Sequence, residues 1–258
     1  QLAVREAFTW HRLYHVNIVP FLGIADYAKI CPGGSTQLCL VSPWLPDGDI
    51  MEYLKTNPAV SPFPLLVDIL DGVEYLHSHA SGPIIHGDLK ANNILLDFRV
   101  IRARPTARLI DFGLSRIMEV DMPGGVSRSS SADKGNARWL AFERLRPGQY
   151  RLQQSETRTT MSDVFEVMRT FFEILTGGCP FQGKTEIEAL LQALDGANPE
   201  RPLNCYWIDD ERWNLMLECW SQDRDTRPSL DTLREDLKQS IWIDRLLVCS
   251  SSCHINAK

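Results

Sequence analysis

The sequence predicts an α+β protein in which a short mixed segment is followed by a mainly helical remainder. Two short apolar runs typical of strands lie within residues 1–45, and apolar residues recur at helical spacing through most of the later chain. The 258 residues suit one large domain or two closely packed lobes, and 44% hydrophobic with 23% charged residues is the composition of a globular protein. A solenoid, a coiled coil and a disordered chain are therefore disfavoured.

The first part of the chain carries one helical segment and two strand segments. Residues 5–13 hold apolar side chains at mostly helical spacing, which predicts a helix. Residues 18–24 and 38–42 are short apolar runs with Cys-Pro-Gly-Gly between them. Because proline and glycine favour turns, we expect two strands there with a turn in the connection.

The remainder is predicted to consist of helices, loops and two short strands. Apolar residues recur every three to four positions from Leu66 to Leu76, after Ser61 and a proline-containing first turn, as in a buried helix. Strands are expected at residues 94–96 and 108–110, and a Gly/Ser-rich loop at residues 118–137. Further helices are predicted at residues 162–175, 185–194, 209–220 and 229–237, and a terminal helix at 241–248. Ser162 and Ser229 are the predicted N-terminal caps of the first and the last of these four helices.

Charge and cysteine usage narrow the classes of partner and compartment. Lys plus Arg number 27 against 33 Asp plus Glu, a net charge of −6, which disfavours nucleic acid and anionic membranes as partners. No apolar run approaches the roughly 18–20 residues of a membrane-spanning helix, so we expect a soluble cytoplasmic protein without membrane insertion. Seven scattered cysteines favour reduced thiols. Cys249, Cys253 and His254 indicate a frayed terminus more strongly than a zinc site.

Two short motifs carry the chemistry. His-Gly-Asp-Leu-Lys-Ala-Asn-Asn spans residues 86–93, and Asp-Phe-Gly follows at 111–113 after a strand and a connection. Phosphoryl transfer needs a carboxylate at the attacking hydroxyl, a cation at the γ-phosphate and oxygen ligands for Mg²⁺. The side chains that supply these groups are Asp88, Lys90, Asn93 and Asp111.

Together the motifs resemble the catalytic loop, H-R-D-x-K-x-x-N, and the metal-binding D-F-G of eukaryotic protein kinases. The resemblance extends from residue 6 to residue 237. It implies a bilobal fold with a partial N-lobe and a mainly helical C-lobe, ATP and Mg²⁺ as cofactors, and a protein as substrate. Arg138-Trp139 and Cys219-Trp220 resemble the tyrosine-kinase-like branch of serine/threonine kinases.

The resemblance assigns roles to the residues of the two motifs. Asp88 matches the residue that orients and accepts the proton of the attacking hydroxyl, and Lys90 the cation that stabilises the γ-phosphate. Asn93 and Asp111 match the two Mg²⁺ ligands. Lys90 also implies serine or threonine, rather than tyrosine, as the phosphorylated residue.

Further matches lie before the catalytic loop. Glu6, nine residues ahead of His15, occupies the position of the helix glutamate that pairs with a strand lysine in the family. Ser42, Pro43 and Leu45 resemble the gatekeeper and hinge, where backbone groups of Pro43 and Leu45 would bind the adenine edge of ATP. For Glu6 the alternative is an ordinary exposed helix residue.

The resemblance also implies structural roles in the rest of the domain. Glu143, near the end of the activation segment, and Arg227 would form a buried ion pair, which is costly to break. Asp163 resembles the helix aspartate that anchors the catalytic loop. The positions that match the regulatory spine, an apolar stack joining the lobes, are Trp10, Phe21, His86 and Phe112.

Several departures bear on activity. Gly87 replaces the usual arginine, so an activation-loop phosphate lacks its standard partner, and Asn136 and Phe142 replace Thr and Pro. No G-x-G-x-x-G or V-A-x-K occurs in the sequence. We therefore expect a fragment that transfers phosphate poorly by itself, because several preorganised electrostatic groups are missing. Its expected parts are a partial N-lobe at 1–45, the C-lobe at 46–240 and a tail at 241–258.

Two alternatives remain beside a serine/threonine kinase. One is a catalytically inactive kinase-like module that acts by binding a protein, motivated by the missing motifs and the departures named above. The other is a small-molecule phosphotransferase, which is weaker because the segment up to Glu143 resembles a platform for protein substrates. Taken singly, Asp88, Lys90 and Asn93 would also suit a turn residue, a solvated charge and a cap, but their joint spacing favours catalysis.

Overall fold

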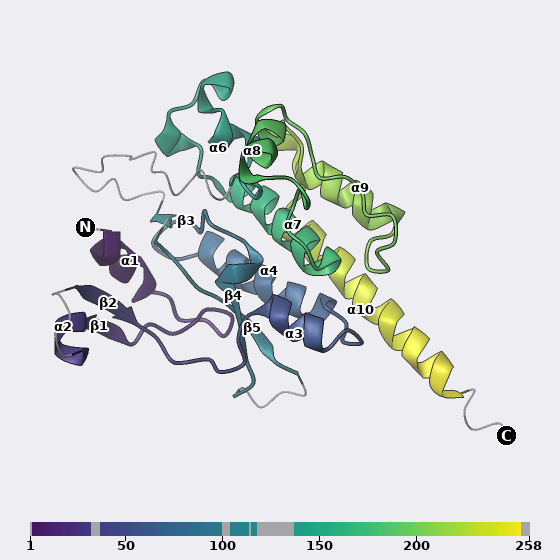
Figure 1. Ribbon diagram of the computed structural model, residues 1–258, viewed down its shortest axis with the longest axis horizontal. Helices are drawn as coiled ribbons and strands as arrows, with labels where there is room; N and C mark the ends of the chain where they lie inside the picture. Colours follow the sequence, from purple (N-terminus) through teal and green to yellow (C-terminus); the bar gives the residue numbers. More distant parts are fainter. Residues whose placement is uncertain (1, 32–36, 100–103, 114, 118–136, 254–258) are drawn as a thin grey trace.

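The computed structural model describes residues 2–31, 37–99, 104–113, 115–117 and 137–253. A small part with two helices and a two-stranded sheet lies at one side, and a larger helical part occupies the rest, with the C-terminal helix extending away from it (Figure 1). The predicted α+β organisation, with a mainly helical larger part, is confirmed.

The small part is built from α1 (Leu2–Trp10), β1 (Gly23–Asp26), α2 (Tyr27–Ile30) and β2 (Leu38–Val41). The two strands are antiparallel, with Gly23 opposite Val41 and Asp26 opposite Leu38. Asp26 also caps α2, since its carboxylate accepts the Ala28 N–H at 3.1 Å. The predicted first helix and second strand are confirmed, each with shifted ends.

The first strand begins later than the sequence predicts. A strand over residues 18–24 is wrong for most of that run, since β1 starts at Gly23. Pro20 lies in the middle of the run and has no N–H to donate to a ladder. Val19 instead pairs with the larger part, where its N–H donates to the Leu109 carbonyl at 3.0 Å.

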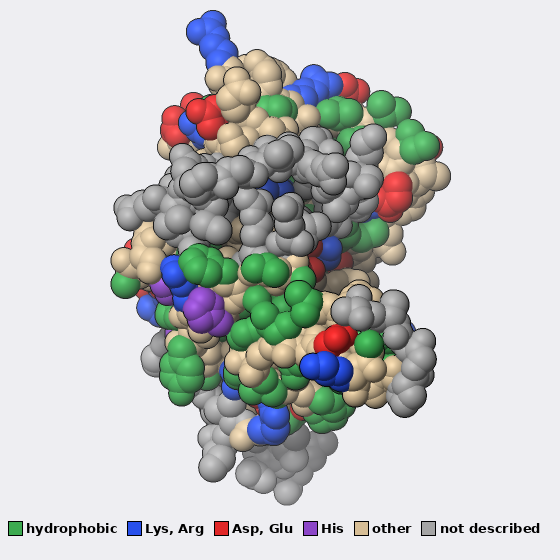
Figure 2. All heavy atoms as spheres, turned by 90° about the vertical axis from the view of Figure 1, so that its left-hand side faces the viewer, with side chains coloured by type: hydrophobic (Ala, Val, Ile, Leu, Met, Phe, Trp, Pro, Cys, Tyr) green, Lys and Arg blue, Asp and Glu red, His purple; other side chains and the backbone are tan. Residues whose placement is uncertain are grey.

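Figure 2 shows the side of the molecule that carries α1, α2 and the small sheet, where hydrophobic side chains gather between charged ones. The exposed apolar side chains of this part include Leu22, Ile24, Tyr27 and Leu38. A two-stranded sheet has little stability of its own. Contacts of β2 with α1 hold it in place, and Asn17 and Val19, which precede β1, form backbone hydrogen bonds with Leu109 of β5.

The larger part is organised around α7 (Thr160–Thr176), in which residues 162–175 are all buried. Helices α4 (Phe63–His77) and α9 (Asp210–Cys219) pack on α7, and α10 (Leu230–Cys253) packs on α4 (Figure 1). The predicted apolar stripe from Leu66 to Leu76 lies in the core, as expected. The remaining helices of more than one turn are α3 (Ile50–Thr56) and α8 (Glu186–Leu194).

Helix caps follow the expected chemistry with one correction. Ser162 is not the cap of α7, because the helix begins earlier and Thr159 occupies that position. Thr159 accepts the Ser162 N–H at 3.1 Å and Ser162 Oγ accepts the Thr159 N–H at 2.9 Å, a reciprocal capping box. Ser229 does cap α10, accepting the Thr232 N–H at 3.3 Å.

Short strands frame the loops that hold the predicted site. β3 (Ile84–Ile85) pairs with β6 (Arg116–Ile117), and β4 (Ile94–Asp97) pairs with β5 (Thr106–Leu109), both antiparallel. The 3₁₀ turn η1 (Ala91–Asn93) leads directly into β4. The segment 86–93 therefore lies between β3 and β4, and residues 111–113 lie between β5 and β6.

The remaining elements are short, apart from the end of the chain. α6 (Phe142–Leu145) is one helical turn, and three 3₁₀ turns are η2 (Pro147–Tyr150), η3 (Gln154–Glu156) and η4 (Arg224–Thr226). The expected terminal helix at 241–248 is not separate but belongs to α10. Most of the predicted loop at 118–137 lies outside the described residues, as do His254 and the side chains of Cys249 and Cys253. In the part that is described, no helix is long and apolar enough to cross a membrane.

Candidate functional site

The segment 86–93 is anchored to α7 through Asp163, which is fully buried. Its Oδ2 accepts the His86 N–H at 2.9 Å, and its Oδ1 accepts the Gly87 N–H at 3.0 Å. His77 Nε2 lies 2.9 Å from the same Oδ2. Burial alone would raise the pKa of Asp163, but these hydrogen bonds and the nearby imidazoles outweigh it and lower that pKa. The carboxylate therefore serves as a fixed acceptor for two successive amides.

Asp88, Lys90 and Asn93 meet in one cluster. Asp88 is 7% exposed, and its Oδ2 accepts from Lys90 Nζ at 2.9 Å and from Asn93 Nδ2 at 3.0 Å. Asn93 Nδ2 also donates to the Asp88 carbonyl at 2.7 Å. Since the amide nitrogen of Asn93 makes both bonds, its Oδ1 is the atom that remains for a cation.

His86 is a buried scaffold residue beside this cluster. Its Nε2 lies 3.1 Å from the Ile110 carbonyl, and its Nδ1 accepts the Asp88 N–H at 3.3 Å. Both contacts are satisfied by the neutral tautomer that carries the proton on Nε2. Burial lowers the pKa of His86, against the opposing charges of Asp163, Asp88 and Asp111. A neutral ring is therefore the form that the fold stabilises.

Asp111 lies next to Glu6 and has an uncommon backbone conformation. Its φ of 64° is in the left-handed region, and the Gly113 N–H donates to its Oδ1 at 3.2 Å. A Cβ built on Gly113 would lie 3.3 Å from Glu6 Oε2, so the two carboxylates approach the same glycine. Partial burial and then the Asp111 charge raise the pKa of Glu6. Strained aspartates of this kind occur at functional sites.

Four rings form a continuous stack from the small part to the catalytic segment. Phe112 lies 5.4 Å from His86 and 5.7 Å from Trp10 between ring centroids, and Trp10 lies 5.4 Å from Phe21. Trp10 Nε1 also donates to the Val19 carbonyl at 2.6 Å. The four positions that the sequence places in one apolar stack are therefore in contact in the described structure.

Glu143 and Arg227 form a buried bidentate ion pair. Arg227 Nη1 and Nη2 lie 2.7 Å from Glu143 Oε1 and Oε2, and both side chains are 0% exposed. The pair joins α6, which follows the predicted activation segment, to the residues that precede α10. Asn136, which replaces a threonine of the family, lies outside the described residues.

The predicted hinge follows β2 directly. Ser42 and Pro43 are half-buried, and Leu45 is 5% exposed and belongs to the main hydrophobic core. The Leu45 side chain thus packs inward, and adenine binding by the backbone of Pro43 and Leu45 stays a prediction.

The geometry agrees with a comparison of the whole chain with known families. The family described as protein tyrosine and serine/threonine kinase matches residues 1–237. The chain belongs to this protein kinase family. It follows that the larger helical part is a kinase C-lobe, and the role of the anchored segment 86–93 as its catalytic loop stays a prediction.

The relatives of this chain include both serine/threonine-protein kinases and tyrosine-protein kinases. Serine/threonine-protein kinase VIK of Arabidopsis thaliana is 32% identical over 240 residues, which cover 90% of this chain and 50% of the relative. Serine/threonine-protein kinase STY46 of the same plant is 28% identical over 91% of this chain and 36% of the relative. Proto-oncogene tyrosine-protein kinase ROS of Mus musculus is 27% identical over 96% of this chain and 10% of the relative. The chain thus spans half or less of the length of each.

Protein kinases use ATP with Mg²⁺, and the charge around the two motifs is compatible with such a cation. Asp88, Asp111 and Asp163 each act electrostatically on His86, so negative charge is concentrated around the two motifs, where a divalent cation would be stabilised. In the described residues no group of three or more His, Cys, Asp or Glu side chains is arranged to hold a metal ion. Mg²⁺ commonly takes one or two protein ligands and completes its shell with phosphate oxygens and water, so a site with only the two predicted ligands, Asn93 and Asp111, would be an ordinary one.

Sequence reasoning missed several charged residues beneath the catalytic loop. Glu173 on α7 accepts the Ala91 N–H at 2.9 Å and the Trp139 Nε1–H at 2.9 Å, joining the segment 86–93 to the residues that precede α6. Burial raises the pKa of Glu173. Arg144 and Glu166 form a second buried ion pair at the same place.

A signal for the buried charges of α7, but not for Arg144, was present in the sequence. Glu166, Arg169 and Glu173 interrupt a largely apolar segment at spacings of three and four, which places them along one side of a helix. A charge inside an apolar helix needs a partner, because burying it alone is costly. The pattern indicates buried pairing, but only the structure identifies the partners.

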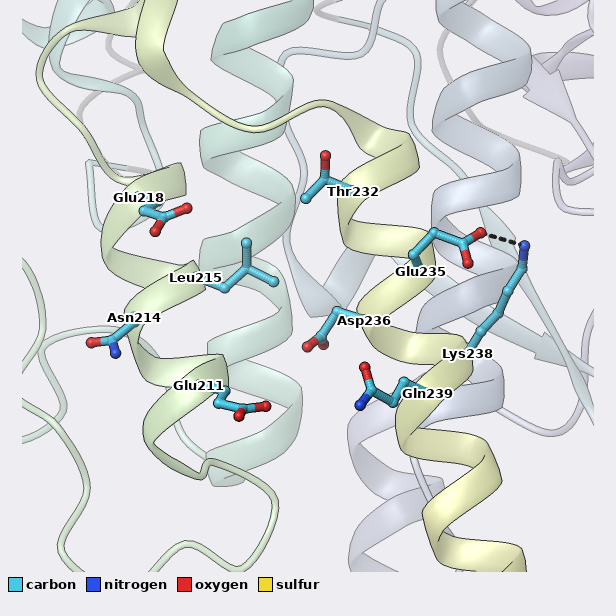
Figure 3. A pocket seen from close by; sticks show the side chains of 9 residues that line it. All are labelled: Glu211, Asn214, Leu215, Glu218, Thr232, Glu235, Asp236, Lys238 and Gln239. Carbon is cyan, nitrogen blue, oxygen red and sulfur yellow. Dashed lines mark hydrogen bonds and ion pairs between the residues drawn. The ribbon is translucent and has the colours of Figure 1, made fainter.

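A hollow of about 630 Å³ opens on another face of the kinase C-lobe, between α9 and α10. Acidic side chains of both helices border it, and the Lys238 side chain pairs with Glu235 at 2.8 Å at its edge (Figure 3). None of its lining residues belongs to the predicted site. It is therefore separate from the catalytic segment.

Proposed function

We propose that the intact protein transfers the γ-phosphoryl group of ATP to serine or threonine hydroxyls of protein substrates. Asp88 orients the hydroxyl and accepts its proton, and Lys90 offsets the negative charge on the transferred group. Asn93 and Asp111 hold Mg²⁺, and Ser42, Pro43 and Leu45 form the edge against which adenine lies. Bound Mg·ATP supplies the phosphoryl group and the cation that neutralises its charge.

The single observation that carries this proposal is the clustering of Asp88, Lys90 and Asn93 on a segment anchored by Asp163. Lys90 Nζ and Asn93 Nδ2 both reach Asp88 Oδ2, at 2.9 and 3.0 Å. The Asp88 carboxylate is therefore fixed in orientation before a substrate arrives, which is what proton transfer from a positioned hydroxyl requires.

Serine and threonine specificity is supported by Lys90 and by relatives named serine/threonine-protein kinases. The position of Lys90, within hydrogen-bonding distance of Asp88, lets its cation approach both the carboxylate and the phosphoryl group. A tyrosine-protein kinase is also among the relatives. A peptide substrate series that differs only at the accepting residue decides between the two.

We further propose that residues 1–258 transfer phosphate poorly by themselves. The sequence contains no G-x-G-x-x-G segment and no V-A-x-K, and the described residues place no lysine or arginine in an ion pair with Glu6. Groups that bind the α- and β-phosphates are thus lacking within these residues. These same observations favour the alternative function, a kinase-like module that binds a partner protein without catalysis.

Phosphoryl transfer from ATP to a mixture of serine, threonine and tyrosine peptides tests the proposal. The intact protein is compared with Asp88→Asn and with Asp225→Asn, a matched change at an exposed carboxylate. We expect Asp88→Asn to lower kcat by at least about 100-fold and leave the Kd for Mg·ATP within about twofold, since the carboxylate acts on the hydroxyl. Asp225→Asn leaves both unchanged. Equal activity of Asp88→Asn and the intact protein would overturn the assignment.

A further inference from the structure

Arg144 is a buried arginine whose guanidinium lies against the catalytic segment. Its Nη1 donates to the Gly87 carbonyl at 2.8 Å and forms a short contact with Glu166 Oε1 on α7. Both side chains of this pair are 1% exposed. Neither residue was assigned a role by the motifs, although one of them follows Glu143 directly.

The backbone around Gly87 is consequently held on both sides. The Gly87 N–H donates to Asp163 Oδ1 at 3.0 Å, and the Gly87 carbonyl accepts from Arg144. Gly87 has a φ of 72°, a conformation that favours glycine, and it has no side chain of its own to fix its orientation. The backbone bonds therefore set how the chain enters Asp88.

The contact at the carbonyl has a direct effect on Asp88. The Gly87 carbonyl and the Asp88 N–H belong to one planar peptide group. That N–H donates to His86 Nδ1 at 3.3 Å, so the same plane is held at its oxygen by Arg144 and at its nitrogen by His86. Rotation of this plane would displace the Asp88 carboxylate from Lys90 and Asn93.

We propose that Arg144 and Glu166 are positioning residues for phosphoryl transfer: Arg144 holds the Gly87 carbonyl, and Glu166 holds Arg144 in place. This inference rests on the proposed function, because it assigns the pair a role through Asp88. It also connects α6, which follows the activation segment, to the catalytic loop through a single guanidinium. The position of α6 is then transmitted to the peptide group that precedes Asp88.

A purely structural role for the pair has a different consequence. Buried ion pairs are often replaced by apolar residues of similar volume without loss of stability. If the pair only fills the core, methionine at both positions leaves the catalytic loop unchanged. If the pair positions the loop, the same double variant folds but loses the bond to the Gly87 carbonyl.

The test compares the intact protein with the double variant Arg144→Met/Glu166→Met. Arg146→Met is the matched control, because Arg146 is exposed and pairs with Asp195 on the surface at 3.4 Å. Amide hydrogen exchange is measured at residues 86–88 and at 164–169 of α7, together with kcat and the KM for ATP. Arg144→Lys is a second variant, which keeps a charged donor and changes the side-chain volume less.

We expect exchange at residues 86–88 to accelerate about tenfold in the double variant, the loss of about one hydrogen bond to a charged group, with α7 unchanged. We expect kcat to fall about 10–100-fold while the KM for ATP stays within about twofold, because misplacement affects the reacting geometry and not nucleotide binding. Arg144→Lys shows the same changes with smaller magnitude, and it replaces the double variant in the test if that variant fails to fold. Arg146→Met shows none of them.

Two results would overturn the inference. Unchanged exchange at residues 86–88 means that the pair does not hold the loop, and equal acceleration throughout α7 means that it serves general stability. An intact protein without transferase activity contradicts the proposed function instead. In that case the exchange measurement still decides whether Arg144 holds the Gly87 carbonyl.

Discussion

Two neighbouring residues of α6 form buried ion pairs of different kinds. Glu143 pairs with Arg227 through two contacts of 2.7 Å, whereas Arg144 pairs with Glu166 through one nitrogen that also serves the Gly87 carbonyl. Arg227 has further acceptors in the carbonyls of Met161 and Ser221, at 2.8 and 3.1 Å. Glu166 Oε2, in contrast, has no hydrogen-bond partner among the described residues.

The two pairs differ in how completely their charged atoms are hydrogen-bonded, and therefore in how much they stabilise the fold. The pair of Glu143 is saturated with hydrogen bonds, and this is the condition under which a buried pair stabilises a fold. The pair of Glu166 leaves a carboxylate oxygen without a partner and therefore contributes less to stability. We ascribe to this pair the role of holding the Gly87 carbonyl next to Asp88.

The largest expected loss of stability comes from breaking the pair of Glu143 and Arg227. Glu143→Gln removes one charge and leaves Arg227 in the core without its counter-ion, so we expect the free energy of unfolding to fall by about 3–5 kcal/mol. Glu235→Gln is the matched control, since Glu235 pairs with Lys238 on the surface at 2.8 Å and its loss should cost less than about 1 kcal/mol. Urea unfolding measures both, and similar losses for the two variants would contradict the comparison.

A smaller effect is expected from the second pair, with strong non-additivity. Arg144→Met leaves Glu166 buried without a cation and should cost about 2–3 kcal/mol. Adding Glu166→Met removes that carboxylate, so the double variant should return to within about 1 kcal/mol of the intact protein. A double-variant cycle by urea unfolding checks this, and additive losses would mean that the two side chains do not act as a pair.

The pair of Arg144 and Glu166 should also respond to pH. Burial raises the pKa of Glu166 to about 7, helped by Asp163 and Asp88 and opposed by Arg144, from an unfolded value of 4.5. Because the folded state binds this proton more tightly, the stabilisation is complete below about pH 4.5 and is lost as the pH rises through about 7.

Glu166→Gln removes this titration while keeping the shape of the side chain. Between about pH 5 and pH 8 we expect the intact protein to lose about 2–3 kcal/mol relative to this variant. Thermal unfolding across that range measures the difference. Parallel pH profiles for the two proteins would show that Glu166 is already ionised at the lower pH.

The smallest effect is expected at Arg169, a buried arginine of α7 that forms no ion pair in the described structure. Its guanidinium lies 4.4 Å from the Trp220 ring and donates to Asn198 Oδ1 at 2.9 Å, while Nε and Nη1 have no hydrogen-bond partner. Burial lowers the pKa of Arg169 well below its usual value. Arg169→Met should change stability by less than about 1 kcal/mol, because lost ring contacts and relieved desolvation offset each other. A loss above about 2 kcal/mol would contradict this.

The sequence predicts those parts of the fold and site that depend on local pattern. Apolar spacing is enough to find α4 and most of α7. The contact among Asp88, Lys90 and Asn93 is anticipated because the motif that they resemble has a fixed spacing along the chain. The pair of Glu143 and Arg227 is anticipated because both residues stand in motifs that resemble a known family. The structure then supplies the distance between them.

Other features depend on contacts between distant segments and cannot be predicted from spacing. The start of β1 is misplaced because the chain around Val19 joins β5, a partner that lies far along the sequence. The predicted cap of α7, Ser162, lies three residues after the actual cap, Thr159. The sequence does not separate the two, because both side chains suit a cap and they bond to each other reciprocally. Arg144 has no sequence signal of its own, because its role depends on Gly87 and Glu166 on two other elements.

The most direct test of the central claim is the stabilisation of the intact protein by ATP with and without Mg²⁺. The kinase account predicts a gain of about 2.7 kcal/mol at an ATP concentration of 100 Kd, dependent on Mg²⁺ and lost in Asp111→Asn, whereas Asp225→Asn retains it. No gain with Mg·ATP, or the same gain in Asp111→Asn and in the presence of a chelator, would contradict a magnesium nucleotide site at Asn93 and Asp111.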